Sequence, residues 1–139
     1  MRNFREILSK YGISNTQFRI DLLSLFFNCK SSLTTVEILK KFNRNINKVT
    51  IYRALKSFES KGLIHLVPDK NNLRKYSLCN LDTYTPNTHN HQHAHFICYS
   101  CDQTFCLEDS KIENFISKSI HEVKNYNLVL EGFCSNCKA

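Results

Sequence analysis

The first third of the chain repeats apolar side chains at helical spacing. The segment FRIDLLSLFFNC places them every three or four residues, which predicts a helix. The residues just before it, SNTQ at 14–17, form a capping box in which Ser14 caps the helix and Gln17 reaches back. A second box, TTVE at 34–37, predicts a shorter helix that ends near Phe42.

A third helix is predicted from about Asn47 to Lys61. Its apolar residues stand at i, i+4 and i+7, and Gly62 suits the left-handed position just past a helix end. The residues off this stripe are basic or bear hydroxyl groups, namely Lys48, Thr50, Tyr52, Arg53 and Lys56. A core does not need such a face, but a helix lying in the major groove of DNA does.

Two predicted strands follow this helix. LIHLV at 63–67 and RKYSLC at 74–79 flank the turn PDKNN, and Lys70, Arg74 and Lys75 there suit contacts to phosphate. Three helices and a basic hairpin make a winged helix-turn-helix, which we assign to residues 1–80. The alternative is a small helical domain that binds protein.

The remaining residues predict a smaller α/β unit. Residues 81–90 lack periodicity and are rich in Asn, Thr and Pro, which indicates a hinge. In 91–139, HFIC and QTFCLE predict antiparallel strands and NLVLEGF a last strand, while a capping box at Ser110 and apolar positions as far as Val123 predict an amphipathic helix. The fold class is therefore α+β. A unit of about fifty residues is small for a lone core, so a structural metal or a partner subunit is expected to stabilise it.

The charge of the chain is unevenly placed. Residues 1–80 hold 15 Lys and Arg against 5 Asp and Glu, whereas residues 81–139 hold 4 against 7. The predicted winged domain therefore carries the excess of positive charge, which favours double-stranded DNA as its partner over a merely solvated basic surface. No apolar run is long enough to span a bilayer and no secretory signal begins the chain, so a cytoplasmic protein without a membrane partner is expected.

Seven cysteines are many for a reducing compartment, and an odd number argues against a disulfide framework. Four of them form two C-x-x-C pairs, Cys98 with Cys101 and Cys134 with Cys137. Each pair offers two thiolates on one turn, and together they predict a closed tetrahedral site for structural zinc. The alternative, a thioredoxin-like redox pair, begins a helix after a strand, and neither pair does so.

Histidines stand at alternate positions just before the first C-x-x-C pair. If residues 91–98 are extended, these histidines share one face of the strand and Cys98 lies on the other. The histidines and the C-x-x-C pair therefore belong to different sites. His93 and His95 are the best pair for a second metal, because residues two apart on a strand lie close enough to share one ion.

Two residues of the predicted hairpin lead toward the same region. Cys79 ends its second strand and His65 lies in its first. A metal site that draws on both halves of the chain would couple metal binding to domain orientation, whereas a histidine-rich loop alone can be solvated surface. A hydrolytic zinc enzyme needs H-E-x-x-H or H-x-E, and neither occurs, so we expect no catalytic residues and no small organic substrate.

Together these motifs resemble the ferric uptake regulator superfamily of metal-responsive repressors. The marks are T-[VI]-Y-R at 50–53, H-x-H-x-x-C-x-x-C at 93–101 and the closing C-x-x-C at 134–137, and the likeness covers nearly the whole chain. The resemblance implies a winged-helix DNA-binding domain, a hinge and an α/β dimerisation domain. It also implies a homodimer that binds an inverted repeat when a regulatory metal fills the hinge site. Arg19 matches a family arginine of the second helix, and Ser14 replaces a basic residue there.

Within the superfamily the chain is most similar to the zinc uptake regulators. Leu33 stands where iron and peroxide sensors usually have a histidine ligand, and Gln92 and Ala94 replace the ligands of a second site in iron regulators. His65 and Cys79 match the zinc branch, and a thiolate suits zinc better than iron or manganese. The regulatory set so implied is His65, Cys79, His93 and His95, with His91, Cys106 and Glu108 as further candidates. The alternative is Fe(II) in an iron- or peroxide-responsive regulator of the same fold.

Overall fold

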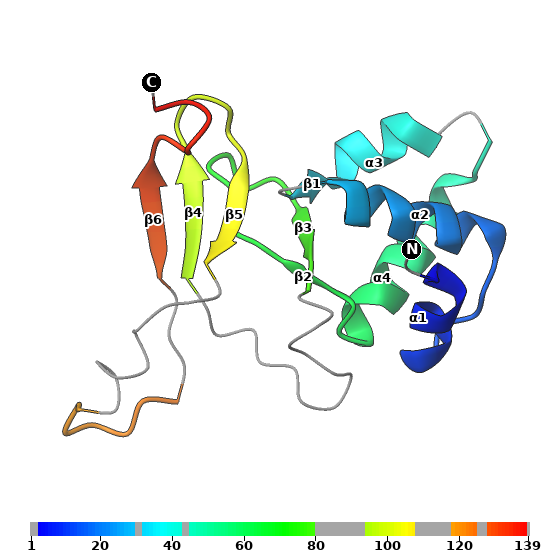
Figure 1. Ribbon diagram of the computed structural model, residues 1–139, viewed down its shortest axis with the longest axis horizontal. Coiled ribbons are helices and arrows are strands. Elements are labelled where there is room, and N and C mark those ends of the chain that lie inside the picture. The colour runs from blue at the N-terminus through cyan, green and yellow to red at the C-terminus, as the bar shows by residue number, and fades with distance from the viewer. Residues whose placement is uncertain are drawn as a thin grey trace.

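Helices gather at one end of the molecule and a small sheet forms the other, with the strands of a wing between them (Figure 1). This computed structural model describes residues 3–29, 32–42, 45–79, 94–107, 118–124 and 128–138. The helices are α1 Phe4–Lys10, α2 Gln17–Asn28, α3 Thr35–Phe42 and α4 Lys48–Ser60. The strands are β1 Leu33–Thr34, β2 Ile64–Leu66, β3 Lys75–Leu78, β4 Ala94–Cys98, β5 Thr104–Leu107 and β6 Val129–Gly132. One sheet has the order β1-β3-β2 and the other β5-β4-β6, so the predicted α+β class is confirmed.

The start of α2 differs from the prediction. Thr16, not Ser14, is the N-cap, and its Oγ1 accepts from the backbone N–H of Arg19 at 3.3 Å. The Ser14 hydroxyl instead accepts from the Arg19 guanidinium at 3.0 Å. Gln17 already lies in the first turn, and its side chain bonds forward to Asp21 rather than back. The predicted capping box at 14–17 is therefore wrong in its register, because a run of Ser, Asn and Thr offers several N-caps of similar strength.

The second capping box is confirmed. The backbone N–H of Glu37 donates to Thr34 Oγ1 at 3.1 Å, and the Glu37 carboxylate accepts from the N–H of Thr34 at 3.4 Å. The helix that follows, α3, ends at Phe42 as expected. This reciprocal pair satisfies two N–H groups that the first turn of a helix leaves without intrahelical partners.

The bounds of α4 also follow the prediction. Asn47 caps the helix by accepting from the N–H of Val49 at 2.8 Å, and Gly62 takes a φ of 82° just beyond its end. The apolar stripe Ile51, Leu55 and Phe58 is buried against the other helices, with no more than 2 % of any of the three exposed. Burial of this stripe turns the basic face of α4 outward.

Two elements of the winged domain were not expected. Helix α1 is only seven residues long and contributes Leu8 to the core. Strand β1 has two residues and pairs with β3 through Leu33 and Tyr76. Elements this short carry too few positions to establish a period, so their sequence pattern does not reveal them.

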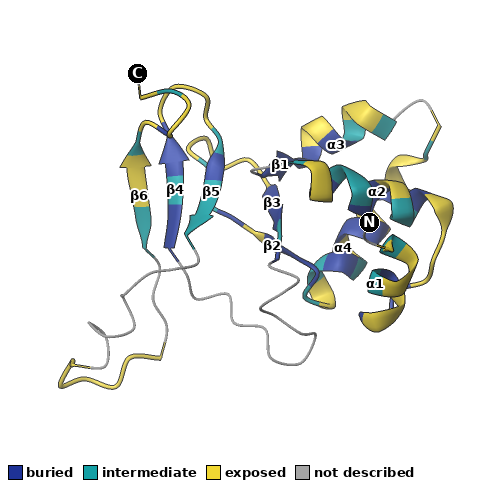
Figure 2. Cartoon of the chain, viewed as in Figure 1, coloured by how far each residue is buried: buried dark blue, intermediate teal, exposed yellow. Residues whose placement is uncertain are grey.

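The two faces of the second sheet follow from its register. The antiparallel pairing of β4 with β5 sets His95 opposite Cys106 and Ile97 opposite Thr104. These four side chains share one face, which we call the inner face because it meets the wing. Side chains alternate along a strand, so Phe96 and Phe105 lie on the opposite face, which we call the outer face. Strand β6 joins β4 in parallel, and Figure 2 shows the central β4 mostly buried and β6 more exposed.

Two predictions for the second half fall wholly or partly outside the described residues. The predicted hinge, 81–90, lies outside them, as does most of the predicted amphipathic helix. Residues 118–124, its last part, form turns and bends, and Ile120 is 94 % exposed. The helix prediction is wrong for these residues, because an apolar period yields a stable helix only where a surface buries the stripe. Among the described helices none is long and apolar enough to cross a membrane.

Candidate metal centres and nucleic-acid interface

The four cysteines of the two C-x-x-C pairs converge at one end of the second sheet. Cys98 ends β4 and Cys101 lies in the turn after it, while Cys134 and Cys137 follow β6. Because β6 runs parallel to β4, both pairs leave the sheet at the same end. All four sulfur atoms lie within 4.8 Å of one another, and the Sγ atoms of Cys101 and Cys134 are 4.0 Å apart. A tetrahedral zinc–thiolate centre separates its sulfurs by about 3.8 Å, so this donor set fits structural zinc.

The thiols of this cluster do not ionise alike. Backbone N–H groups of Cys101 and Cys134 donate to the Cys98 sulfur and lower the pKa of Cys98 to about 6. The pKa of Cys137 is raised to about 12, because its contact with the Cys134 thiol favours the protonated form. The Cys98 thiolate therefore forms readily, and the Cys137 thiol would lose its proton as a cation binds.

A second group of donors lies between the wing and the inner face of the sheet. His65 comes from β2, His95 from β4 and Cys106 from β5, and their ligand atoms lie within 4.8 Å of one another. The Cys106 Sγ is 3.3 Å from His65 Nε2, and the two imidazole centroids are 5.9 Å apart. Zinc bound to one nitrogen and one sulfur holds these atoms about 3.5 Å apart, so the three donors fit a single ion.

Cys79 lies on the other side of the His65 ring. Its sulfur is 3.2 Å from Nδ1, whereas Cys106 is next to Nε2, so one buried imidazole stands between two thiols. An ion held by one ring nitrogen has only one of these thiols beside it. Among the described residues, the group within 4.8 Å consists of His65, His95 and Cys106, and does not include Cys79.

The structure thus assembles part of the predicted regulatory set and adds to it. His65 and His95 meet, Cys106 joins them, and Cys79 lies beside the far nitrogen of His65, outside this group. The other predicted candidates, His93, His91 and Glu108, lie outside the described residues. Cys106 was a secondary candidate because its place opposite His95 depends on the register of β4 and β5, which spacing along the chain does not give.

The basic face of α4 is available for nucleic acid. Tyr52 is 46 % exposed, and the other predicted contacts on this helix, Lys48, Thr50, Arg53 and Lys56, are exposed as well. Arg19 is half-buried on α2 beside Ser14, and Arg74 is exposed on the wing, where its guanidinium donates to the Tyr76 hydroxyl at 3.3 Å.

One predicted phosphate contact is wrong. Lys75 is only 3 % exposed, and its ammonium forms an ion pair with Asp69 at 2.8 Å. The side chain points toward the second sheet rather than toward solvent, and its ammonium donates to the Asp102 carbonyl at 2.7 Å. Charge and nearness to a turn could not distinguish Lys75 from Arg74, its exposed neighbour.

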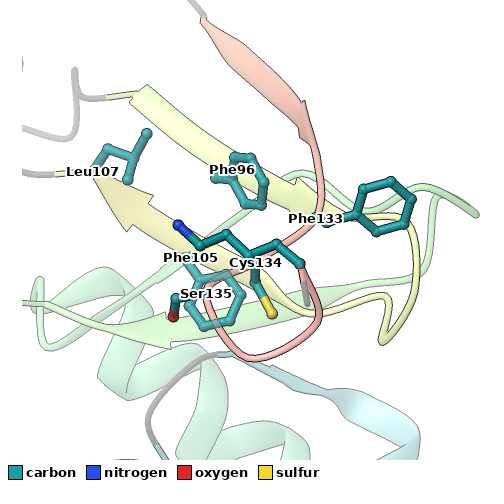
Figure 3. A pocket seen from close by; sticks show the side chains of 7 residues that line it. Phe96, Phe105, Leu107, Phe133, Cys134 and Ser135 are labelled. Carbon is teal, nitrogen blue, oxygen red and sulfur yellow. The ribbon is translucent and has the colours of Figure 1, made fainter.

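The outer face of the second sheet is apolar and partly open. Phe96, Phe105 and Leu107 line a cavity of about 290 Å³ with Phe133 and the turn that follows it (Figure 3). Phe133 is 57 % exposed. An exposed surface of this composition usually marks a contact with another chain or segment.

The fold and the two donor sets define a class of protein. A winged helix joined to a sheet that carries cysteine and histidine ligands is the architecture of a metal-responsive transcriptional regulator. The chain matches the model of the ferric uptake regulator family over residues 10–131, and it belongs to that family. The family consists of regulators and not of enzymes, in agreement with the lack of a hydrolytic motif.

Relatives of both metal types are similar to the chain. It is 25 % identical over 139 residues to the zinc uptake regulation protein of Mycobacterium tuberculosis, covering 95 % of this chain and 100 % of that one. It is 20 % identical over 145 residues to the ferric uptake regulation protein of Helicobacter pylori, covering 99 % and 91 %. A zinc uptake regulator solved with zinc and DNA has a TM-score of 0.65 at 20 % identity, with 95 % and 88 % covered. The Vibrio cholerae ferric uptake regulator also has a TM-score of 0.65, at 21 % identity, with 95 % and 100 % covered.

Proposed function

We propose that the protein is a zinc-dependent repressor that binds operator DNA as a homodimer when zinc occupies the site of His65, His95 and Cys106. The observation that carries this proposal is the meeting of donors from both halves of the chain between the wing and the second sheet. Imidazole and thiolate together suit zinc, whereas non-haem Fe(II) sites commonly combine two histidines with a carboxylate. His93 stays a prediction for the remaining ligand, and Cys79 would be a ligand only of an ion on the Nδ1 side of His65.

Zinc at this site would act by fixing the orientation of the wing. His65 belongs to β2, and the other two donors belong to β4 and β5. An ion bound by all three stabilises the arrangement in which these strands lie together, and it shifts the population toward that arrangement by its differential affinity. In a dimer the same shift sets the separation of two α4 helices, which must match two half-sites on DNA.

The exposed face of α4 supplies the contacts to DNA in this proposal. Thr50 and Tyr52 in its first turns are the base-reading candidates, and Lys48, Arg53 and Lys56 are the phosphate contacts. Arg19 is a further candidate from α2. Because much of the affinity then comes from phosphate neutralisation, binding should weaken steeply as salt is raised.

A second copy of the chain is the proposed partner of the outer face. Leu130 and Phe133 are about half exposed there, and this half of the chain is too short to build a large core of its own. Burial of Phe133 and its neighbours against a second subunit would supply the missing stability and bring two winged domains into one molecule.

The alternative is an iron-dependent regulator of the same fold. It has the support of the ferric uptake regulation proteins, whose similarity to this chain is comparable to that of the zinc regulators. The Cys106 thiol in the donor group argues against it, because a thiolate ligand suits zinc better than Fe(II) or Mn(II).

A DNA-binding titration tests the proposal. Protein that retains only the metal of the four-cysteine site is mixed with an operator selected from random duplexes, and fluorescence anisotropy is followed as free Zn(II) or free Fe(II) is raised in metal buffers. We expect zinc to switch binding on at a far lower free concentration than iron. Activation by Fe(II) at its physiological level with Zn(II) inert would instead assign the iron-dependent function.

A further inference from the structure

Lys75 has a set of contacts that the proposed sensing site does not use. Its side chain is 4 % exposed, and its ammonium donates to the Asp102 carbonyl at 2.7 Å and to Thr104 Oγ1 at 3.2 Å besides its ion pair with Asp69. An ammonium has three donors, and here each has an acceptor. Lysine is rarely buried to this extent unless it is paired, so these contacts compensate for a substantial desolvation cost.

The acceptors come from opposite sides of the contact between wing and sheet. Asp69 belongs to the wing turn, whereas Asp102 and Thr104 belong to the turn and strand that follow Cys101. Thr104 is fully buried and donates in return to the Pro68 carbonyl at 2.9 Å. We call Lys75, Asp69, Asp102 and Thr104 the wing latch. Lys70 and Asp102, at 3.8 Å and about half exposed, add only a weak surface pair.

Both ends of the latch are held in place. The Asp102 residue takes a φ of 59°, and its N–H donates to the Cys98 carbonyl at 3.0 Å, so the four-cysteine turn determines where its carbonyl points. Burial disfavours the charged form of Asp69, but bonds from Lys75 and from the N–H groups of Asn71 and Leu73 outweigh it and lower its pKa. The wing therefore keeps an ionised partner for Lys75 at neutral pH.

The latch and the sensing site lie along one strand. Thr104 and Cys106 share the inner face of β5, two residues apart, and contact the wing at Pro68 and His65 respectively. A single point of contact would leave the wing free to rotate about it in any direction, whereas two points restrict its rotation to the axis that joins them.

We propose that Lys75 is a positioning residue for operator binding, because it fastens the wing to the turn of the four-cysteine site independently of the sensing metal. This inference rests on the proposed DNA-binding function. It makes the four-cysteine site a contributor to wing orientation through the Asp102 carbonyl, and not only a support for its own sheet.

Two substitutions test the latch from opposite sides, Thr104→Val and Lys75→Met. Thr104→Val keeps the side-chain shape and changes no residue of the winged domain. It removes one of the three acceptors of Lys75 and the donor to the Pro68 carbonyl. With saturating buffered zinc we expect each variant to weaken operator binding about tenfold, since charge-assisted buried bonds of this kind are lost. Zinc content, measured by chromophoric chelator after thiol modification, should equal that of the parent protein.

Lys70→Met is the matched control, because it removes the same charge from the wing, in the turn that precedes β3. A loss of operator affinity in that variant would come from screened surface charge and should disappear at higher salt. The loss in Lys75→Met and Thr104→Val should persist there, because the latch is buried. If Lys75→Met fails to fold with Asp69 left unpaired, Lys75→Met/Asp69→Asn removes both charges and replaces it.

Residual dipolar couplings of backbone amides give a readout that does not depend on DNA. In the parent protein the wing and the β5-β4-β6 sheet should share one alignment tensor, and in Thr104→Val the two tensors should diverge. Equal tensors and unchanged operator affinity in Thr104→Val and Lys75→Met would overturn the latch while leaving the proposed repressor intact. A parent protein that binds no operator with any metal would overturn the repressor, and the couplings would still decide the latch.

Discussion

His65 is the residue through which both halves of the chain meet at the proposed sensing site. It is buried, it belongs to the wing, and each of its ring nitrogens has a cysteine sulfur beside it. The nitrogen that binds the metal decides which thiol is a ligand and which is a hydrogen-bond partner of the ligand. Such partners orient a metal-bound imidazole and affect metal affinity in their own right.

The two thiols can be separated by substitution. We expect Cys106→Ser to raise the free zinc needed for half-maximal operator binding by more than a hundredfold, because a direct ligand is lost, and Cys79→Ser to raise it about ten- to a hundredfold, because an orienting partner is lost. Zinc-dependent anisotropy measures both values. Cys29→Ser, at a half-buried cysteine outside both donor groups, is the control. A larger effect of Cys79→Ser than of Cys106→Ser would move the ion to the Nδ1 side of His65.

At the scale of the element, α4 carries two functions on opposite faces. Its buried stripe anchors the helix in the core, and its exposed residues form the basic face. The helical period separates them, so a substitution on one face should leave the property of the other unchanged.

Phe58→Ala and Lys56→Ala test this separation. Phe58 is fully buried, so its truncation should lower the free energy of unfolding by about 3–5 kcal/mol, as measured by urea denaturation. Lys56 is exposed, so its removal should change stability by less than about 0.5 kcal/mol. The slope of log affinity against log salt should become shallower by about 0.9 if Lys56 neutralises one phosphate. An unchanged slope would remove Lys56 from the DNA contacts.

At the scale of the whole molecule, the second sheet links the metal centres to assembly. Its inner face holds the sensing donors and the latch, its outer face is apolar and partly exposed, and its end carries the four cysteines. A sheet this small depends on a metal or a partner subunit for its stability. Loss of the metal should therefore weaken the association of the subunits, and loss of the partner should weaken metal binding.

Cys98→Ser is the test at this scale. The change removes one thiolate from the four-cysteine group, and we expect the variant either to sediment as a monomer or to unfold, with zinc content reduced by one ion per chain. Analytical ultracentrifugation and circular dichroism measure these outcomes, and Cys29→Ser should behave like the parent. A Cys98→Ser protein that remains a stable dimer would refute a structural role for the metal.

The sequence alone predicted most of the local elements. The stripe of α4, its cap at Asn47 and the glycine beyond its end are interactions among residues a few positions apart, and the structure confirms them. The alternation that placed His95 and Cys98 on opposite faces is equally local, and the separate donor groups agree with it. Such features depend on residues a few positions apart, so a pattern along the chain predicts them.

Contacts between distant segments were decided by the tertiary structure alone. In the sequence, Lys75 is one more basic residue near a turn. It is buried because Asp102 and Thr104, some thirty residues away, accept hydrogen bonds from its ammonium. Cys106 reaches His65 only once β5 pairs with β4 and the sheet docks on the wing. Such contacts depend on how whole elements pack against one another, so the residue pattern within one segment does not determine which distant residues it meets.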